Sequence, residues 1–195
     1  VDVYDERLIE LAKLYNTNKI IPAQIEFVDI AGLVKGASEG AGLGNKFLSH
    51  IKEVDAIVHV VRCFKNDKII HVEGSVDPVR DIETINLELI LADIDTVTKR
   101  IDKIKKIVHG GSSDLATQKE YELLNRILEV LKEGKSARIL KFDPDEKKIV
   151  DGFFLITTKP VIYVANTSDT LDDFQKENIK KIEEMAKKEN AEVIS

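Results

Sequence analysis

Apolar residues recur along this chain with two different spacings, and the two spacings predict different elements. Between Leu87 and Val108 the apolar positions are separated by alternating steps of three and four residues, which is the spacing of an amphipathic helix. Shorter segments at 24–30, 56–64 and 161–165 are rich in Val and Ile, which predicts strands. Strands that alternate with helices are typical of a parallel sheet, so we expect an α/β fold.

The helical pattern in the middle of the chain continues past a break. HGGSSD at 109–114 interrupts the first helix with two glycines, and helical spacing then resumes and runs to Leu131. Two helices joined by a short polar turn predict an antiparallel helical hairpin. We place this hairpin at 79–135, inserted into an α/β domain formed by 1–78 and 136–195.

The remaining segments complete the α/β pattern. Asp143, Pro144 and Glu146 have the spacing of a helix start, with an Asp cap, Pro at the first helical position and Glu three residues after the cap. Residues 31–45 contain five glycines, which predicts a mobile loop. Other predicted elements are helices at 5–15, 46–53 and 172–189 and a strand at 191–194.

Composition narrows the class of protein. The chain has 195 residues, 43% of them hydrophobic and 33% charged, with a formal net charge of −6. These values are typical of a globular protein and argue against one that coats nucleic acid generally. A single cysteine, Cys63, excludes internal disulfides and a cysteine-based zinc site. No membrane span or secretory signal is present in the sequence, so we expect a cytoplasmic protein.

The strongest local motif is Asp29-Ile30-Ala31-Gly32, at the end of the first predicted strand. Ligands of α/β folds sit at the carboxyl ends of strands, and an Asp there can hold Mg²⁺, usually through water. Gly32 would let its backbone N–H approach a terminal phosphate closely, and the glycine-rich loop after it could order when that phosphate is present. An ordinary turn at the end of a strand is the alternative.

A second motif, Asn166-Thr167-Ser168-Asp169, follows the strand predicted at 161–165. An Asn amide at that position can bond to a purine ring, and a carboxylate three residues later can accept a hydrogen bond from a base. The alternative is a turn stabilised by the Asn side chain. Two such motifs at the carboxyl ends of two strands strengthen one another.

At this point the sequence resembles the YchF-type Obg-like ATPases, which are P-loop NTPases related to the translation-factor GTPases. The residues that carry the resemblance are FVDIAGLVKGASEGAGLGNKFL at 27–48, HVVRCF at 59–64, IIHVEGSVDP at 69–78 and DIETINLELILAD at 81–93. The resemblance implies a partial Ras-like P-loop NTPase domain with an inserted helical hairpin. It also implies Mg²⁺-dependent ATP hydrolysis, preferred over GTP hydrolysis, and a link to ribosomes and stress responses.

The sequence departs from this family in two large respects, because neither GxxxxGK[ST] nor the family's TGS domain occurs within the 195 residues. The resemblance implies that the P-loop, first strand, first helix and first switch lie before Val1, and that a ubiquitin-like TGS domain lies after Ser195. A P-loop supplies the backbone amides, the Lys and the Mg²⁺-binding hydroxyl that hold the phosphates. We therefore expect weak nucleotide binding, or none, by these 195 residues alone.

The resemblance also assigns roles to residues. Asp29 would act through Mg²⁺, Gly32 on the γ-phosphate, and Asn166, Thr167 and Asp169 on the base. The family usually has Glu where Asp169 stands, and GTPases have Asp there, so GTP remains an alternative substrate. Leu33 occupies the position at which Ras-like enzymes carry a water-orienting Gln.

His71 is the candidate that would replace this Gln, because a neutral imidazole can accept a hydrogen bond from water. A structural or solvated histidine is the alternative. We interpret His59 as a core or sheet-end residue and His50 and His109 as surface groups. Cys63 follows a predicted strand and is best interpreted as a small buried hydrophobic residue.

The predicted hairpin suggests a different class of function. Its first helix ends in a basic cluster, which consists of Lys99, Arg100, Lys103, Lys105 and Lys106. Such a cluster on a projecting arm could contact the phosphates of rRNA, although a solvated helix face explains it more simply. The alternatives to an ATPase are therefore a GTPase switch and a non-enzymatic module that binds ribosomes or proteins through the hairpin.

Overall fold

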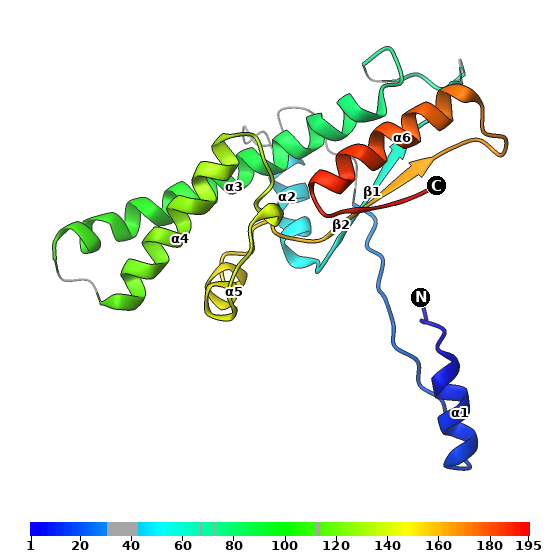
Figure 1. Cartoon of the computed structure of the whole chain (residues 1–195), viewed down its shortest axis with the longest axis horizontal. Coiled ribbons are helices and arrows are strands. Elements are labelled where there is room, and N and C mark those ends of the chain that lie inside the picture. The colour runs from blue at the N-terminus through cyan, green and yellow to red at the C-terminus, as the bar shows by residue number, and fades with distance from the viewer. Residues whose placement is uncertain (31–42, 67, 72, 112–113) are drawn as a thin grey trace. The chain divides into compact units, whose positions relative to one another are not determined.

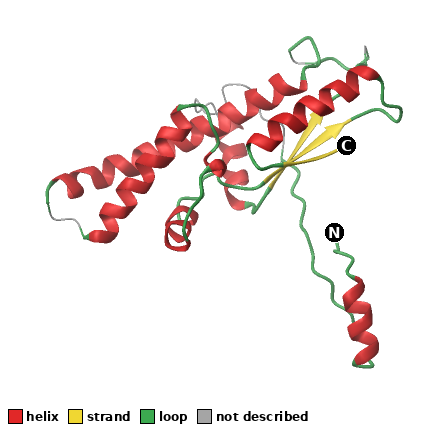
Figure 2. Cartoon of the chain, in the orientation of Figure 1, coloured by secondary structure: helices red, strands yellow, loops and turns green. Residues whose placement is uncertain are grey.

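The structure is a computed structural model that describes residues 1–30, 43–66, 68–71, 73–111 and 114–195. Contacts divide the chain into two units, Val1–Ala31 and Gly32–Ser195, and each is described by itself. Figures 1 and 2 show the elements. They are α1 (Glu6–Leu14), α2 (Leu43–Glu53), β1 (Ile57–Arg62), α3 (Pro78–His109), α4 (Leu115–Lys132), a 3₁₀ turn (Ala137–Ile139), α5 (Pro144–Asp151), β2 (Val161–Asn166), α6 (Asp173–Lys188) and β3 (Glu192–Ile194).

Aspartates determine where most of these helices begin. In α1, α3, α4, α5 and α6 the residue before the helix is an Asp whose carboxylate accepts a backbone N–H of the first turn. A carboxylate there satisfies an otherwise unpaired donor and interacts favourably with the helix dipole. These aspartates are Asp5, Asp77, Asp114, Asp143 and Asp172. The helix start predicted at Asp143 is confirmed, with a complete capping box.

The three strands form a parallel sheet in the order β1-β2-β3. Ile57 pairs with Val161 and Arg62 with Asn166, so β1 and β2 end level with one another. The predicted strands at 56–64, 161–165 and 191–194 and the α/β fold class are thereby confirmed. Loops that leave β1 and β2 therefore start from the same edge of the sheet.

One face of this sheet is covered by α3 and α6, which lie side by side over the strands in Figure 1. Val61, Tyr163 and Ala165 point to that side and are buried, together with Ile82 of α3 and Ile182 of α6. The period of two along the strands leaves the alternate residues on the opposite face. In the described parts of the chain these include Val58, Val60 and Ile194, which are 45%, 60% and 54% exposed.

The long helix α3 and the shorter α4 pack along one another, joined by a short connection (Figure 1). The alternating apolar stripe is buried as predicted from Ile90 to Ile104, where it contacts Leu124, Ile127 and Leu131. Leu87 was expected in the stripe but is 51% exposed, because α3 passes from the sheet to α4 within its length. A separate hairpin domain at 79–135 stays a prediction, since both helices belong to the unit Gly32–Ser195. Among the described helices none is long and apolar enough to cross a membrane.

The strand predicted at 24–30 is wrong. Only Gln24 forms a β-bridge, an antiparallel one to Asp2, and the backbone N–H of Ile25 donates to the carbonyl of Val1. From Glu26 onward the described residues show no ladder partner for this segment, and Phe27 is 65% exposed. Strand propensity alone cannot pair the backbone groups of an extended segment without a neighbouring strand.

The glycine-rich loop predicted at 31–45 is only partly within the described residues. Residues 31–42 lie outside them, and so does the expectation of mobility. The last three residues of the predicted loop are helical, because α2 begins at Leu43 and ends at Glu53. The helix predicted at 46–53 is confirmed with an earlier start.

A buried carboxylate joins the hairpin to the segment that leads into β2. Asp93 of α3 is 0% exposed and accepts hydrogen bonds from the backbone N–H groups of Ile156 and Thr157, at 2.9 and 2.7 Å. The Thr157 hydroxyl donates a third, at 2.6 Å. Burial raises the pKa of the Asp93 carboxyl, and the bonds from Thr157 and Ile156 oppose that rise.

Replacing this carboxylate by its isosteric amide should destabilise the fold. In Asp93→Asn the amide nitrogen would face backbone donors, so at least one buried N–H loses its acceptor, at a cost of about 3 kcal/mol in the free energy of unfolding. Urea denaturation measures the loss. The matched control is Asp95→Asn, because Asp95 is exposed and forms a surface ion pair with Lys99; it should cost less than about 1 kcal/mol. Equal midpoints for the two variants would contradict this role of Asp93.

His59 of β1 makes folding sensitive to pH. Burial lowers its pKa to about 4, the charge of Arg138 adds to the effect, and Asp81 opposes it. In the unfolded chain His59 takes up a proton near pH 6.5, whereas the folded protein holds it neutral down to about pH 4. Proton uptake therefore favours the unfolded chain, and the contribution of His59 to stability is present above pH 6.5 and lost as the pH falls toward 4.

The measurement is an NMR titration of the His59 ring, which should show a midpoint near pH 4. The difference in stability between the wild type and His59→Gln should decrease as the pH falls below 6.5. A midpoint at the ordinary histidine value would show that His59 is solvated in the folded protein.

Candidate functional site

Two loops meet at the carboxyl edge of the sheet. The first follows β1 and runs from Cys63 to α3, and the second follows β2 and runs from Thr167 to α6. The backbone N–H of Cys63 donates to the carbonyl of Asn166 at 2.8 Å, which extends the pairing of the two strands by one residue. The Lys65 ammonium lies 4.0 Å from the centroid of the Phe174 ring at the start of α6. The two loops are thus tied together at their origin.

Arg62, the last residue of β1, organises the first loop. Its guanidinium donates to the carbonyls of Phe64, Ile69 and Asn66, at 3.0, 3.0 and 3.2 Å. A planar fork with several donors can hold several carbonyls at once, which an ammonium does less well. The Arg62 guanidinium thus holds the backbone of the loop that follows β1 through these three carbonyls.

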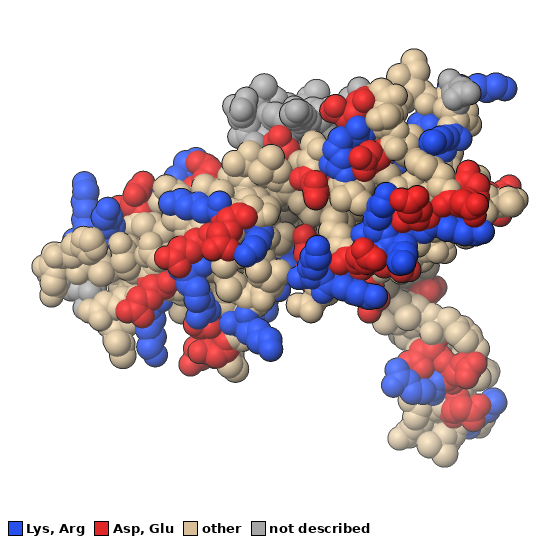
Figure 3. All heavy atoms as spheres, turned by 45° about the horizontal axis from the view of Figure 1, so that its top comes forward, with Lys and Arg blue, Asp and Glu red and all other residues tan. Residues whose placement is uncertain are grey.

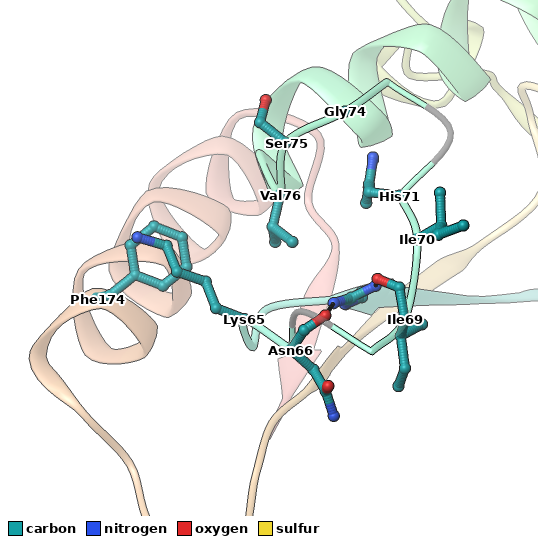
Figure 4. Close-up of a pocket in the computed structure, with 10 residues that line it drawn as sticks. Lys65, Asn66, Ile69, Ile70, His71, Gly74, Ser75, Val76 and Phe174 are labelled. Carbon is teal, nitrogen blue, oxygen red and sulfur yellow. Dashed lines mark hydrogen bonds between the residues drawn. The ribbon is translucent and has the colours of Figure 1, made fainter.

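This loop and the start of α6 enclose an open cavity of about 550 Å³ (Figure 4). Ile69 and Val76 provide apolar lining, and Phe174 lies on the opposite side from His71. The ammonium of Lys65 rests against the Phe174 ring in the same view. The cavity thus has a mixed apolar and polar lining, with the ammonium of Lys65 already placed over a face of the aromatic ring.

His71 is held at both ring nitrogens in this structure. Its Nε2 lies 2.9 Å from Oδ2 of Asp81, and its Nδ1 accepts a hydrogen bond from the backbone N–H of Glu73 at 3.2 Å. The neutral ring therefore carries its proton on Nε2 and donates it to Asp81. The other Asp81 oxygen accepts from Arg80 Nε and Nη2, at 3.2 and 3.0 Å, which completes a chain of three charged or titratable groups.

The candidate base-reading residues lie on the second loop. Asn166 ends β2 and is exposed, Thr167 is half-buried, and Asp169 is exposed. Asn166 and His71 thus belong to loops that leave adjacent strands at one edge. The arrangement predicted from the sequence was a different one, with Asp29–Gly32 and Asn166–Asp169 at the ends of two strands of one sheet. That prediction is not confirmed, because the strand predicted at 24–30 does not form. The side chain of Gln175 in α6 holds this loop through Ser168.

The candidate phosphate and metal residues lie elsewhere in the chain. Asp29 is an exposed residue of the unit Val1–Ala31, which is described by itself, and Gly32 lies outside the described residues. The described residues contain no group of three or more His, Cys, Asp or Glu side chains that could hold a metal ion. Mg²⁺ is commonly bound by one or two carboxylates with water and substrate phosphate, so the exposed Asp29 carboxylate fits it chemically.

The interpretation of Cys63 as a buried residue is confirmed. Cys63 is 0% exposed, its Sγ lies 3.6 Å from the carbonyl of Val61, and burial raises the pKa of its thiol to about 11. A thiol with that pKa is almost entirely protonated near neutral pH, which makes it a poor nucleophile. His50 and His109 are exposed, as predicted.

The basic cluster of the hairpin is partly neutralised. Lys99 pairs with Asp95 at 2.6 Å, and Arg100 forms a bidentate pair with Glu120 of α4. On the side of the molecule that Figure 3 shows, basic and acidic side chains are interspersed along the hairpin. Lys103, Lys105 and Lys106 are exposed near the end of α3 and are the part of the cluster best placed for a partner.

Sequence reasoning missed three residues that shape the site, namely Arg62, Asp81 and Gln175. A charged residue that ends an apolar strand is a signal for Arg62, since such a residue must find partners at the edge of the sheet. The pattern Asp172-x-x-Gln175 indicates a helix start, but it cannot show that the Gln side chain reaches another loop. Nothing in the sequence indicates that Asp81 faces His71.

Comparison with known proteins identifies the family. A family model described as a 50S ribosome-binding GTPase matches residues 10–140. The chain belongs to the 50S ribosome-binding GTPase family. It is 52% identical over 196 residues to the ribosome-binding ATPase YchF of Bacillus subtilis, and 44% identical over 195 residues to that of Haemophilus ducreyi. The resemblance to the YchF-type ATPases is thereby confirmed.

A solved structure supports the same family. The YchF GTPase of Schizosaccharomyces pombe superposes with a TM-score of 0.79 at 37% identity, and covers 100% of this chain. This similarity confirms the Ras-like P-loop NTPase architecture. In each comparison this family member spans 53% of the other protein, so the chain is about half as long as the relatives it matches.

Proposed function

We propose that these residues form the base-reading and switch part of a Mg²⁺-dependent nucleotide hydrolase that acts on ribosomes and prefers ATP to GTP. The observation that carries the proposal is the shared carboxyl edge, where the loops after β1 and β2 present His71 and Asn166. Family membership supports a nucleotide as the ligand. The bacterial relatives are named ATPases and the yeast relative a GTPase, so the base has to be tested. Ribosome association would place the protein in the cytoplasm.

In this proposal each motif residue has one task. Asn166 and Asp169 read the base, and Thr167 lines the base pocket. Asp29 holds Mg²⁺, usually through water, and Gly32 approaches the γ-phosphate with its backbone N–H. When bound, Mg²⁺ neutralises charge on the phosphates. Phosphoryl transfer depends mainly on positioning and charge neutralisation. In this proposal these residues therefore act by holding the nucleotide and Mg²⁺ in place.

His71 would position the attacking water in the same proposal. Its Nε2–H donates to Asp81 and its Nδ1 accepts from the amide of Glu73, so the bond from Glu73 must open before Nδ1 can accept from water. The pair with Asp81 meanwhile holds the ring in one tautomer. A protein that carries these residues together with a P-loop would lose turnover, but not ATP binding, on His71→Ala.

ATP binding can be tested residue by residue in the ¹⁵N-labelled 195-residue chain. Titration with ATP and Mg²⁺ should shift the amide signals of Asn166, Thr167 and Asp169, at millimolar concentrations because no P-loop sequence is present, and GTP should shift them less. Asn166→Ala should abolish the shifts, while the matched control Asn18→Ala and the variant His71→Ala should keep them. Absence of shifts at saturating ATP, or retention of them in Asn166→Ala, would overturn the base-reading assignment.

Ribosome binding can be assigned to the hairpin separately. Replacing Lys103, Lys105 and Lys106 together by Ala should weaken co-sedimentation with ribosomes about tenfold or more, and flatten its salt dependence, because contacts to phosphate are lost. The matched control replaces three lysines of α6, Lys176, Lys180 and Lys181. Equal loss in both triple variants would refute a specific role of the hairpin. ATP-induced shifts that survive the hairpin variant would separate the nucleotide site from a purely binding module.

A further inference from the structure

Helix α6 begins with the pattern Asp172-x-x-Gln175, which matches the start of α5, Asp143-x-x-Glu146. In both helices the Asp carboxylate accepts the backbone N–H of the residue three positions later, at 2.7 Å in α6 and 2.8 Å in α5. In α5 the Glu146 side chain returns to the backbone N–H of Asp143 and closes a capping box. In α6 the corresponding Gln175 side chain takes a different course.

The Gln175 carboxamide holds the loop that follows β2. Its Oε1 accepts the backbone N–H of Ser168 at 3.0 Å, and its Nε2 donates to Ser168 Oγ at 2.7 Å. Ser168 Oγ in turn donates to the carbonyl of Thr170 at 2.9 Å. Gln175 is only 2% exposed whereas Ser168 is exposed, so these bonds are shielded from water on the α6 side. One buried side chain therefore determines the course of the backbone through this loop.

The residues held in this way are the candidates for base reading. Ser168 lies between Thr167 and Asp169, and the carbonyl of Asn166 is bound by the amide of Cys63 at 2.8 Å. The loop is thus fixed at Asn166 by the neighbouring strand and at Ser168 by α6. Recognition of a flat base by hydrogen bonds requires donors and acceptors at defined positions. The side chains that provide them must therefore stand on a backbone that is itself held in place.

We propose that Gln175 is a positioning residue for base recognition, because its buried carboxamide holds Ser168 and so sets the places of Thr167 and Asp169. This inference rests on the proposed function, in which those two residues contact the purine. Gln175 itself does not touch the nucleotide. Loss of its carboxamide releases the loop, while the residues that would contact the phosphates are unchanged.

The test compares Gln175→Leu with the matched control Asn178→Leu in the ¹⁵N-labelled chain. Asn178 lies one turn later in α6 and is 7% exposed, and its Nδ2 has no hydrogen-bond partner within the described residues. Gln175→Leu should speed hydrogen exchange of the Ser168 amide and weaken ATP binding about tenfold. Tripolyphosphate, which carries no base, should shift the amide signals of both variants as it does those of the wild type.

A double variant adds a second readout. Since Gln175 acts through Ser168, the effects of Gln175→Leu and Ser168→Ala on ATP affinity should be less than additive. Equal ATP affinity in the wild type and Gln175→Leu, or an equal loss in Asn178→Leu, would overturn the inference while leaving the proposed function intact. A wild-type chain that shows no base-dependent binding, with ATP and tripolyphosphate giving the same shifts, would overturn both.

Discussion

The parallel pairing of β1 with β2 is the constraint on which the candidate site depends. Because Arg62 stands opposite Asn166, two loops far apart in the sequence leave the sheet at the same level. The Cys63 amide prolongs this pairing beyond the strands, and Arg62 then gathers the carbonyls of the first loop. A shift of one residue would turn the buried Val61 side outward and separate the two loops. Burial of the apolar strand residues against α3 and α6 therefore stabilises the pairing register of β1 and β2 as well as the core.

The second constraint is the junction at Asp93, which connects the helical hairpin to the segment before β2. Apolar residues alone could hold α3 against α4, but they do not specify how α3 meets the backbone at Ile156 and Thr157. A buried carboxylate that accepts three hydrogen bonds does specify it, since any displacement leaves buried donors unpaired. The hairpin is thereby coupled to the strand that carries Asn166, which gives a physical connection between the hairpin and the carboxyl edge of the sheet.

The fold could be predicted largely from spacing, and the site only in part. The spacing of apolar residues predicts the helical stripe from Ile90 to Ile104 and the strands at 57–62 and 161–166. In these elements the same spacing also predicts burial in the core. Residues 24–30 carry a strand pattern as well, but a strand exists only when a neighbour pairs with it, and pairing is not a local property. The carboxyl ends of β1 and β2 share one edge because parallel topology requires it, but the predicted partner of the Asn166 motif was Asp29, and the strand predicted before Asp29 does not form. The partners of His71 and Gln175 were not predictable, since ten and seven residues separate them from Asp81 and Ser168.

The two helix starts of α5 and α6 show why such partners escape sequence reasoning. Asp143 and Asp172 cap their helices in the same way, and each is followed three residues later by a side chain able to close a capping box. Glu146 closes the box, and it is accessible to Arg126, with which it also pairs. Gln175 instead faces a loop whose Ser168 offers both a donor and an acceptor, and a neutral amide can satisfy both whereas a carboxylate can only accept. The choice between Gln and Glu at this position thus follows from the groups that the side chain faces. The same local motif closes a capping box in α5 and holds the loop after β2 in α6.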